Sequence, residues 1–399
     1  MKRIILLSLV IPTFNNTRAA SALPYHLIRG MGNDATFEIF SFNINKIDEG
    51  DILKVEQELN VKIHVLQQPK WMVWMFKFHL SFLRLFLNFP YLAYCNLTKE
   101  TINKINSLHP DVIWIYGEEI SGLAKKFKNQ SVVVTMPDCT SLYYYRLLGK
   151  SFATIRIIDV VRYLIVYLKY LRLERYSYLT AKANHVHVKY HFVGQVDTDF
   201  FKEHVGNANA VFLRHPLYAH QPKDFTFHMP IRLLIAGQYN IYMKKDADIL
   251  IAELLKNSEE LKRDYVITFL GKGWEPLVEK LHTLGYKVEL IRFAPVYIDE
   301  LQRHDIQITP ISVGTGTKGK VLDAVSNGLL VIGTEAALEN IALRDGESCI
   351  IYKDVDMLIS ILKDIPRNIQ KYEVMAEIGY KEIIVNHDHE KVAHNLFKN

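Results

Sequence analysis

Short apolar runs alternate with segments of helical period along most of this chain, and this alternation predicts parallel strands covered by helices. The clearest helical patterns are Thr17–Gly30 and Lys99–Leu108. The runs with the character of buried strands are Arg3–Ile11, Thr36–Phe42, Val61–Leu66, Asp111–Tyr116, Ser131–Met136, His185–Lys189, Ala210–Leu213, Ile231–Ala236, Tyr265–Leu270, Lys287–Ile291, Ile306–Thr309, Leu329–Gly333 and Cys349–Tyr352.

An irregular, proline-rich segment interrupts this alternation near the middle of the chain. RHPLYAHQPKDFTFHMP, residues 214–230, contains three prolines and has no periodicity. Such a segment is typical of a linker. Two βα arrays joined by a linker imply an α/β fold of two doubly wound, Rossmann-like domains that face a cleft. We place the domains at residues 1–214 and 231–370, the linker at 215–230, and a C-terminal helix at 371–399 that crosses back to the first domain.

The most informative stretch is TPISVGTGTKGKVLDAVSNGLLVIGT, residues 309–334, in which an apolar run, a glycine-rich turn, a helical pattern and a strand follow one another. The turn contains Gly314, Gly316 and Gly319. A glycine turn that opens a helix predicts an anion site, because backbone N–H groups and the positive helix end point at whatever lies there. Lys318 adds positive charge. Asp323 is unfavourable beside a phosphate unless it binds a ribose or sugar hydroxyl, so the sequence predicts a pocket for a nucleotide diphosphate carrying a sugar.

This stretch resembles the donor-binding signature of GT-B glycosyltransferases, in particular the large retaining group 1 family. There a strand ending in Pro, a Gly-rich loop with a basic residue, an acidic helix and a strand of the form G-x-x-V-I-x-T follow in this order. The resemblance implies the GT-B fold, with the acceptor site in the first domain and the donor site in the second. It further implies that Lys318 faces the donor diphosphate and that Asp323 takes the ribose-binding position. The loop residues assigned to the donor are Gly314, Thr315, Gly316 and Thr317.

The start of the second domain carries further donor-site candidates, in IAGQYNIYMKKDADILI. The family's counterpart is G-R-x…K-G-x-D-x-L, whose Arg and Lys hold the donor phosphates. The resemblance places Gly237 in the turn and Lys245 at the Lys position. Gln238 stands where Arg is usual, so a second charge has to come from elsewhere, with Lys244 as a candidate. The alternative is that both lysines form a solvated helix start.

Two later loops complete the predicted donor site. Family members carry G-x-G near the nucleotide where this chain has Gly271-Lys272-Gly273, although a tight turn explains these glycines equally well. Ile291-Arg292-Phe293 matches the region that contacts the base, and we take Phe293 as the residue concerned.

On the acceptor side, Asn15 and Asn16 follow the first predicted strand, where the family has a glycine-rich loop close to the donor phosphate and the acceptor. Asn tolerates left-handed backbone and can replace glycine there. Arg18 is close enough in sequence to reach the cleft. The alternative is a plain turn with Asn16 or Thr17 as helix cap.

Two carboxylates follow neighbouring strands of the first domain. Asp138 occupies the acid position of a His-Asp pair that many retaining relatives have, and it could orient an acceptor hydroxyl or act as a base. An Asx-turn or a helix N-cap is the alternative. Glu118 ends the preceding strand at the same edge and is a second acceptor-side candidate.

Composition fits this interpretation without adding to it. A net charge of +5 suits anionic substrates or an anionic lipid surface and does not require nucleic acid. Three cysteines and sixteen histidines show neither a disulfide framework nor a metal-ligand spacing, which favours a reducing cytosol and chemistry without a metal or cofactor. The apolar start MKRIILLSLVIP is short for a signal peptide and is interpreted as the first strand.

Two segments rich in apolar, aromatic and basic residues predict contact with a membrane surface. Trp71–Tyr94 is rich in aromatic residues and has no acidic residue, and Phe152–Tyr178 places several Arg and Lys among apolar residues. Their charges recur too often for a membrane span. Basic amphipathic helices with aromatic rings lie in the lipid interface. The alternative is that both cover the sheet, with long basic side chains reaching water.

We therefore expect a retaining, hexosyltransferase-type glycosyltransferase that moves a sugar from a UDP- or GDP-linked donor to a glycan or polyprenol-linked acceptor in surface polysaccharide assembly. It would act in the cytoplasm, at the inner face of the plasma membrane. The candidate catalytic residues are Asp138, Lys318 and Lys245. Two rivals remain: a sugar-nucleotide epimerase of the same fold, and a non-catalytic relative that binds glycan or partner enzymes. The second rival is suggested by Thr315, Gln238 and Pro137, which depart from the family pattern.

Overall fold

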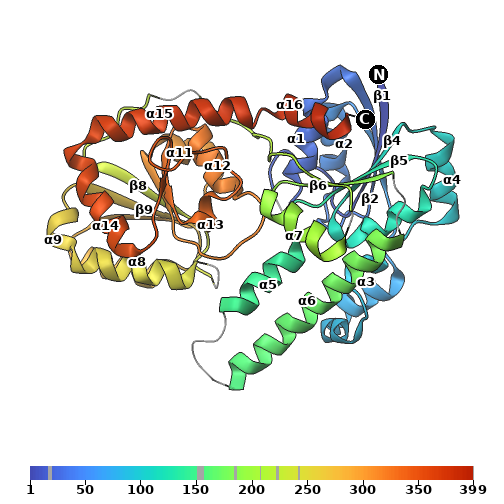
Figure 1. Ribbon diagram of the computed structural model, residues 1–399, viewed down its shortest axis with the longest axis horizontal. Helices are drawn as coiled ribbons and strands as arrows, with labels where there is room; N and C mark the ends of the chain where they lie inside the picture. Colours follow the sequence, from blue (N-terminus) through green and yellow to red (C-terminus); the bar gives the residue numbers. More distant parts are fainter. Residues whose placement is uncertain are drawn as a thin grey trace. The chain divides into compact units, whose positions relative to one another are not determined.

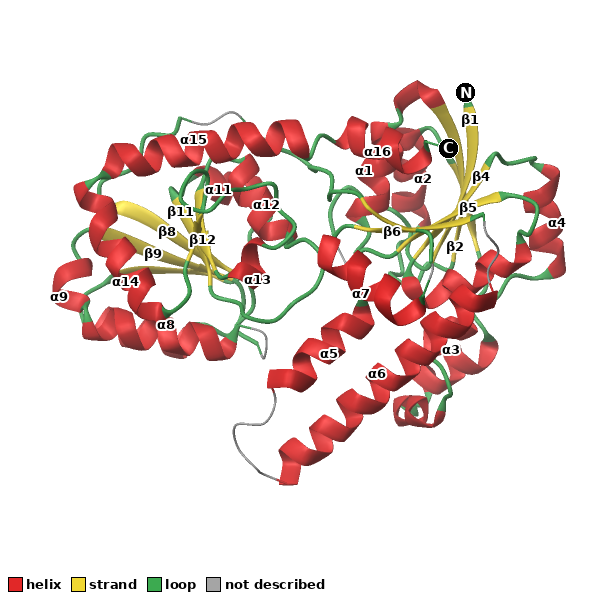
Figure 2. Cartoon of the chain, in the orientation of Figure 1, coloured by secondary structure: helices red, strands yellow, loops and turns green. Residues whose placement is uncertain are grey.

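The computed structural model describes residues 1–16, 20–150, 157–183, 187–206, 208–221, 224–240 and 243–398. The chain divides into two compact units (Figures 1 and 2). Unit 1 comprises Met1–Tyr218 together with His389–Asn399, and unit 2 comprises Ala219–Asp388. The division between Tyr218 and Ala219 falls inside the segment 215–230 that we interpreted as a linker, whereas Phe227, later in that segment, is part of the core of unit 2.

Unit 1 is built on a parallel sheet that has seven strands among the described residues, in the order β3-β2-β1-β4-β5-β6-β7. The strands are β1 Lys2–Ser8, β2 Ala35–Ser41, β3 Lys62–Val65, β4 Val112–Tyr116, β5 Ser131–Thr135, β6 Val188–Phe192 and β7 Ala210–Phe212. The helices are α1 Ala22–Gly30, α2 Glu49–Leu59, α3 Lys70–Lys77, α4 Lys99–Ser107, α5 Thr140–Lys150, α6 Ile157–Ala183, α7 Gln195–Val205 and α16 His389–Phe397, with 3-10 turns η1 Gly32–Asp34, η2 Ser81–Phe86, η3 Tyr91–Tyr94 and η4 Glu118–Lys126.

The apolar character of β1 follows from its place in the middle of this sheet. Ile5 and Leu7 pack into the core on one face, and Ile4 and Leu6 pack into the core on the other. A parallel strand covered by helices on both faces has no polar side, which is why its sequence is a continuous apolar run. The strand order reverses between β1 and β4, so the loops after these two strands flank the switch point of the sheet.

Unit 2 has the same architecture, with six parallel strands in the described residues, in the order β10-β9-β8-β11-β12-β13. The strands are β8 Ile231–Ala236, β9 Tyr265–Leu270, β10 Lys287–Ile291, β11 Ile306–Thr309, β12 Leu330–Gly333 and β13 Ile350–Ile351. The helices are α8 Lys244–Lys256, α9 Ser258–Leu261, α10 Glu275–Thr283, α11 Tyr297–Gln302, α12 Gly319–Ser326, α13 Glu335–Leu338, α14 Val355–Asp364 and α15 Ile369–Asn386, with η5 Ile365–Arg367. Its switch point lies between β8 and β11.

Each apolar run predicted as a strand overlaps one, and only β1 and β6 differ from their runs by more than one residue at an end. β1 ends at Ser8 and not at Ile11, because side chains take over the hydrogen bonds of the next residues. The Ser8 hydroxyl donates to the Val10 carbonyl at 2.6 Å, and Asn45 bonds both the amide and the carbonyl of Ile11 at 3.0 Å. β6 begins at Val188, and His185, where we expected its start, is outside the described residues.

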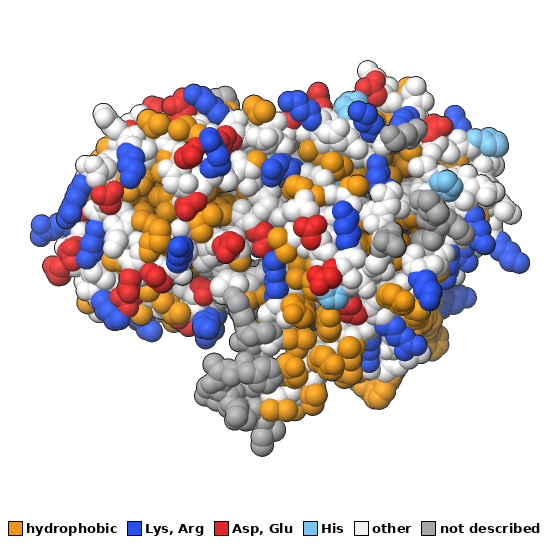
Figure 3. All heavy atoms as spheres, viewed as in Figure 1, with side chains coloured by type: hydrophobic (Ala, Val, Ile, Leu, Met, Phe, Trp, Pro, Cys, Tyr) orange, Lys and Arg blue, Asp and Glu red, His pale blue; other side chains and the backbone are white. Residues whose placement is uncertain are grey.

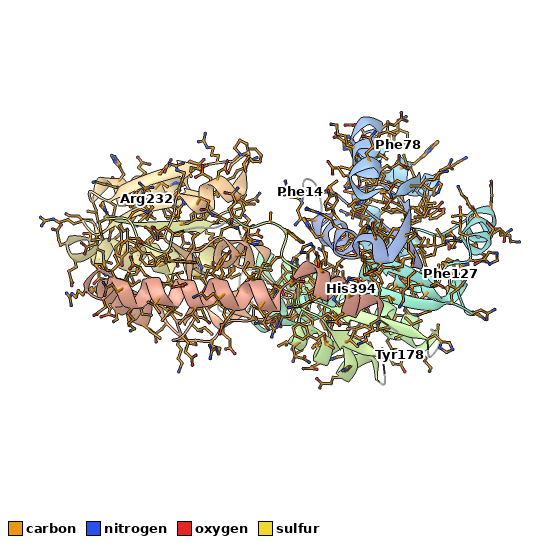
Figure 4. All side chains as sticks on the ribbon, turned by 90° about the horizontal axis from the view of Figure 1, so that it is seen from above. Phe14, Phe78, Phe127, Tyr178, Arg232 and His394 are labelled. Atoms are coloured by element: carbon orange, nitrogen blue, oxygen red, sulfur yellow. The ribbon has the colours of Figure 1, made fainter. Side chains whose placement is uncertain are left out.

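The C-terminal segment forms two helices where we expected one over Lys371–Lys398. α15 belongs to unit 2 and ends at Asn386, and α16 belongs to unit 1. α16 lies against α1, as Figure 4 shows for the helix that carries His394. A Cβ atom at Gly30 would lie 2.5 Å from the His389 carbonyl oxygen, so glycine is what allows the two backbones to approach. Phe397 is buried against Phe37 and Trp114, with ring centroids 5.8 and 5.1 Å away.

The burial of Phe397 predicts that the end of the chain stabilises unit 1. Phe397→Ala should lower the free energy of unfolding by about 3–5 kcal/mol, the usual cost of truncating a buried phenylalanine. Leu53→Ala, at an exposed position of α2 in the same unit, should change it by less than about 0.5 kcal/mol. Urea denaturation followed by circular dichroism measures both, and equal effects of the two substitutions would contradict the packing of α16.

Candidate functional site

The glycine-rich loop after β11 is held in a fixed shape by hydrogen bonds to its carbonyl groups. The Lys318 ammonium donates to the carbonyls of Thr315 and Gly316 at 2.9 and 3.1 Å, and the Asn340 side chain donates to Gly316 at 3.1 Å. Lys318 folds over Gly314, where a Cβ atom would lie 2.6 Å from the lysine Cε. A side chain at position 314 would push the end of Lys318 aside, so glycine there leaves room for the lysine to lie over the loop.

The loop leads into α12, whose first two amides have no acceptor among the residues that the structure describes. Val321 and Leu322 donate their N–H groups to the Lys318 carbonyl at 2.9 and 3.1 Å. Those of Gly319 and Lys320 make no hydrogen bond with the residues that the structure describes. The first amides of a helix lack intrahelical partners and carry the positive end of the helix dipole. The combination of paired carbonyls and open amides makes this edge of unit 2 suited to an anion.

Asp323, on the second turn of α12, is partly buried and has an unusual protonation equilibrium. Burial raises its pKa to about 7, and the positive charge of Lys320 acts in the opposite direction. Its carboxylate has no hydrogen-bond partner within the described ranges. An unpaired carboxylate near an anion site is suited to accept hydrogen bonds from hydroxyl groups.

Gly237 and Gly271 allow the loops after β8 and β9 to touch. Both have positive φ, 150° and 143°, and a Cβ atom at Gly271 would lie only 2.0 Å from the Gly237 carbonyl oxygen. That oxygen also accepts a hydrogen bond from the buried indole of Trp274 at 2.8 Å. The two glycines therefore fix the shape of the sheet edge through backbone packing.

The basic pair at the start of α8 consists of two lysines in different environments. The Lys244 ammonium lies 5.3 Å from the centre of the Tyr239 ring, and Tyr239 in turn donates its hydroxyl hydrogen to Asp248. Lys245 is exposed in the first turn of α8 and makes no hydrogen bond or ion pair with the described residues. Lys245 is thus the one of the two whose charge is available to a ligand.

The donor-site candidates are spread along one edge of the unit 2 sheet. Gly237 and Lys245 follow β8, and Gly314–Asp323 follow β11, so these two groups flank the switch point. Phe293 is 76% exposed and follows β10, three strands away from β11, or about 14 Å at the usual strand spacing. Phe293 therefore lies at the far end of this row of loops.

The acceptor-side candidates follow three adjacent strands of unit 1. Asn15 and Asn16 follow β1, Glu118 follows β4 and Asp138 follows β5. Asn16 has a structural task, because its side-chain oxygen accepts from the amides of Ser21 and Ala22 at 3.0 and 2.8 Å at the start of α1. The helix α1 accordingly begins at Ala22, and Thr17, where we expected its start, is outside the described residues. Arg18 is outside the described residues.

The two carboxylates differ in exposure. Asp138 is exposed at the strand end, and its negative charge adds to burial in raising the pKa of Tyr116. Glu118 is buried, and its two oxygens accept from the Ser177 hydroxyl at 2.8 Å and from the Thr140 amide at 3.2 Å. These bonds connect the loop after β4 to α6 and α5. Burial, reinforced by the neighbouring charge of Glu119, raises the pKa of Glu118 to about 7 against the effect of the two bonds.

Sequence reasoning missed three residues around the glycine loop. Thr334 caps α13 and donates to the Ile311 carbonyl, and Asn340 holds Gly316. Tyr297, at the start of α11, has a buried hydroxyl whose pKa is raised by burial and, secondly, by the negative charge of Asp323. The place of Tyr297 at the start of a helix after a strand-end loop could be read from the sequence, but its unpaired hydroxyl could not. The hydrogen bonds of Thr334 and Asn340 join residues distant in sequence and had no local signal either. Across the described residues, no cluster of three or more His, Cys, Asp or Glu side chains could hold a metal ion.

Comparison with known proteins finds one family match within unit 2 and solved structures that share the fold of the whole chain. Residues 230–367 match the family of glycosyl transferases group 1, and no curated protein matches the sequence. The chain is similar to HepE from Anabaena, crystallised with UDP, with a TM-score of 0.64 and 12% identity over 99% of this chain and 98% of HepE. It is also similar to TarM (TM-score 0.65, 8% identity, 100% and 99% covered) and to a glycosyltransferase from Rickettsia africae (0.61, 13%, 100% and 99%). The predicted α/β fold of GT-B type is confirmed.

The pKa of Glu118 predicts an effect of pH on stability. The folded state binds a proton at Glu118 up to about pH 7, whereas the unfolded chain releases it near 4.5. The stability that Glu118 contributes, relative to Gln, should therefore fall by about 3 kcal/mol as pH rises from 4.5 to 7 and then stay constant. Urea denaturation of the wild type and of Glu118→Gln between pH 4.5 and 8 measures this difference, and a difference that does not change with pH would contradict it.

Proposed function

We propose that this chain, whose residues 230–367 match the glycosyl transferases group 1 family and whose fold is of GT-B type, transfers a sugar from a nucleoside diphosphate sugar to a glycan or lipid-linked acceptor. The observation that carries this proposal is the start of α12, where open amides, a lysine and a glycine loop meet at the switch point of unit 2. UDP- and GDP-linked sugars are both compatible with such a site. HepE, whose fold this chain shares, was crystallised with UDP, with UDP and glucose, and with UDP-glucose.

In this proposal the charge that develops on the departing diphosphate is stabilised by groups that are already in place. The amides of Gly319 and Lys320 and the ammonium of Lys318 lie together at the loop, and Lys245 adds a second positive charge from the next strand. Fixed dipoles and charges of this kind lower the barrier because they need no reorganisation when the bond breaks. Asp323 would bind the ribose, and Gly237, Gly271 and Phe293 would form the wall on the side of the base.

On the acceptor side, we assign Asp138 the task of orienting the attacking hydroxyl, because it is the exposed carboxylate of the sheet edge. Glu118 is committed to α5 and α6 and would act only through the shape of this edge. Retention at the anomeric carbon would follow if the acceptor attacks on the face that the diphosphate leaves, with the leaving phosphate taking the proton. Proton NMR of the freshly formed product reports the anomeric configuration, and an inverted product would contradict this part.

Unit 1 has a large exposed apolar surface that suits contact with an anionic membrane. On α3 and η2 the exposed side chains include Trp71, Trp74, Phe76, Phe78, Phe82 and Phe86, and on α6 they include Val160, Leu164, Tyr167, Leu168, Leu171 and Leu179. Arg172 of α6 donates to the carbonyls of Arg84 and Leu85, so the two segments are in contact. Figure 3 shows hydrophobic side chains gathered over this part of the molecule, and Figure 4 shows Phe78 at the rim of unit 1. We call this the apolar surface.

A hollow of about 870 Å³ adjoins the apolar surface at the carboxyl edge of the unit 1 sheet. Its lining includes Phe42 after β2, Val65 at the end of β3, Val73 and Phe76 on α3, and two lysines, Lys46 and Lys77, with no acidic residue. Apolar walls with a cationic rim suit a lipid chain that carries a phosphate. This supports a polyprenol-linked acceptor delivered from the inner face of the plasma membrane. No helix among the described residues has the length and apolarity needed to cross a bilayer.

Nucleotide binding tests the donor site directly. The protein should bind UDP or GDP, and Lys318→Ala should weaken this binding at least tenfold, because a charge-assisted hydrogen bond is worth about 1.5–3 kcal/mol. Lys287→Ala should have no effect, because Lys287 begins β10 at the opposite edge of the same sheet. Titration calorimetry measures both, and a protein that binds neither nucleotide nor the corresponding sugars would refute a donor site. Incubation with a panel of nucleotide sugars then identifies the product.

Membrane contact is tested with vesicles. The protein should sediment with vesicles that contain anionic lipid and not with neutral ones, and the tryptophan emission should shift to the blue. Of four tryptophans, Trp114 and Trp274 are fully buried, so this shift reports on Trp71 and Trp74. Phe86→Glu should abolish both signals, whereas Val385→Glu, at a similarly exposed position of α15, should change neither. Equal behaviour of the two variants would contradict a membrane role for the apolar surface.

A further inference from the structure

A cavity of about 330 Å³ lies within unit 1, between α6 and the 3-10 turns η3 and η4. Small residues line it on all three elements, namely Ala93 of η3, Gly122 of η4 and Ala183 of α6. A Cβ atom at Gly122 would lie 3.0 Å from the Tyr176 hydroxyl oxygen, so a larger residue there would press against α6. The volume is at the lower end of the range for sites that bind small molecules, about 300–1,000 Å³.

The walls of this cavity are held in place by the protein's own contacts. Tyr176 of α6 donates its hydroxyl hydrogen to the Glu119 carbonyl at 2.5 Å and accepts a hydrogen bond from the Gly122 amide at 3.1 Å, which joins α6 to η4. The Tyr176 ring also packs edge-on against Phe89, with 5.6 Å between the ring centroids. The cavity is therefore preformed, and a ligand that enters it has little of the protein to order.

The lining combines apolar walls with positive charge. Its apolar side chains are those of Phe89, Ala93, Ile120, Leu123, Leu179 and Ala183. Lys125 and Lys126, the last two residues of η4, also line it, and none of its described lining residues is acidic. Both lysines are exposed, and neither makes a hydrogen bond or an ion pair with the described residues. Such a lining suits an amphiphilic anion, whose apolar part avoids water while its charge meets an ammonium group.

The cavity is continuous with the apolar surface. Leu179 of α6 belongs to both, because it lines the cavity and its side chain is also 42% exposed. Arg175, one turn earlier on α6, is exposed and has its guanidinium 5.9 Å from the centre of the Phe89 ring. An amphiphile of a bilayer that contacts the apolar surface can therefore enter the cavity without passing through bulk water.

The position of the two lysines separates this cavity from the acceptor side of unit 1. η4 begins directly after β4 and has nine residues, which at about 2 Å per residue span the length of a five-residue strand such as β5. Its end lies only a few residues before the start of β5 at Ser131. Lys125 and Lys126 are thus near the amino edge of the parallel sheet, whereas Asp138 and the hollow beside Lys46 are at the carboxyl edge.

We propose that this cavity binds one anionic phospholipid, with the phosphate of the headgroup at Lys125 and Lys126 and part of an acyl chain against Leu179 and the other apolar walls. Anionic phospholipids are the amphiphilic anions that a protein meets at a bilayer surface. The inference adds a defined lipid site to the membrane contact proposed above and rests on that contact only for the delivery of the lipid. The bound lipid is not a substrate, and its role is to make adsorption selective for the charge of the headgroup.

Short-chain lipid in monomeric form tests the site without a bilayer. Dihexanoyl phosphatidylglycerol below its critical micelle concentration should bind with one-to-one saturation in titration calorimetry. Dihexanoyl phosphatidylcholine has the same chains and no net charge, and it should bind about tenfold more weakly because its choline cation is repelled by the lysines. Glycerol 3-phosphate, which keeps the phosphate and lacks the chains, should also bind about tenfold more weakly or less, because it buries no apolar surface.

The lysine pair is tested against a control of equal charge. The double variant Lys125→Ala with Lys126→Ala should weaken the binding of the phosphatidylglycerol about tenfold or more. Lys99→Ala combined with Lys128→Ala also removes two exposed lysines of unit 1, but neither of them lines the cavity, so affinity should not change. Because all four side chains are exposed, both double variants should fold, which circular dichroism checks.

The apolar wall is tested in the same way. Leu179→Glu introduces a negative charge into the lining and should abolish binding of the phosphatidylglycerol. Leu171→Glu, two turns earlier on α6 and at an almost equal exposure of 43%, lies outside the lining and should leave binding unchanged.

The inference is overturned if the phosphatidylglycerol does not saturate, if either variant of the cavity behaves as its control does, or if phosphatidylcholine or glycerol 3-phosphate binds as tightly. These outcomes are separate from the vesicle experiment. A protein that sediments with anionic vesicles and fails here retains its membrane contact and loses this site. One that binds the monomeric lipid and does not sediment retains the site and loses the contact.

Discussion

The backbone at the start of α12 has two N–H groups, those of Gly319 and Lys320, for which the described residues provide no acceptor, and the proposed donor site depends on them. In the preceding loop, the carbonyl groups of Thr315 and Gly316 accept hydrogen bonds from Lys318 and Asn340, which hold the loop in shape. Gly314 makes this possible, because any side chain there would displace Lys318. The result is a rigid edge with excess positive potential that exists before any ligand arrives.

The strands were predictable from sequence because both sheets are parallel and covered on both faces, which turns every central strand into an apolar run. Their ends were less predictable, because they are set by side chains distant in sequence. Asn45 hydrogen-bonds the amide and the carbonyl of Ile11, thirty-four positions away, where we had expected β1 to end. The break between α15 and α16 also involves a contact between residues distant in sequence. His387 is fully buried and accepts a hydrogen bond from the Ala342 amide at 3.1 Å, and the local sequence does not predict this contact.

The location of the candidate site was predictable for the same reason as the strands, since loops after neighbouring parallel strands meet at one edge. The roles of the individual residues within the site could not be predicted from the sequence. Sequence placed Lys245 at the family's Lys position and offered Lys244 as a second charge, and only the position of Tyr239 shows that Lys244 is engaged. Glu118 was assigned to the acceptor side from its place at a strand end, yet its partner Ser177 is fifty-nine positions away and gives it a structural task. Tyr297 looked like an ordinary helix residue because an unpaired hydroxyl has no sequence signature.

Glu118 also links the two properties that we propose for unit 1. It fastens the hairpin of α5 and α6, which carries part of the apolar surface, to the edge of the sheet where the acceptor residues lie. A bilayer surface at about −30 mV concentrates protons roughly threefold relative to bulk water. For a carboxyl group that titrates near neutrality, this local acidity favours the uncharged form, which is the form that burial favours. Adsorption to lipid would thereby lower the cost of burying this carboxyl between the hairpin and the sheet edge, and so couple membrane binding to the packing of unit 1.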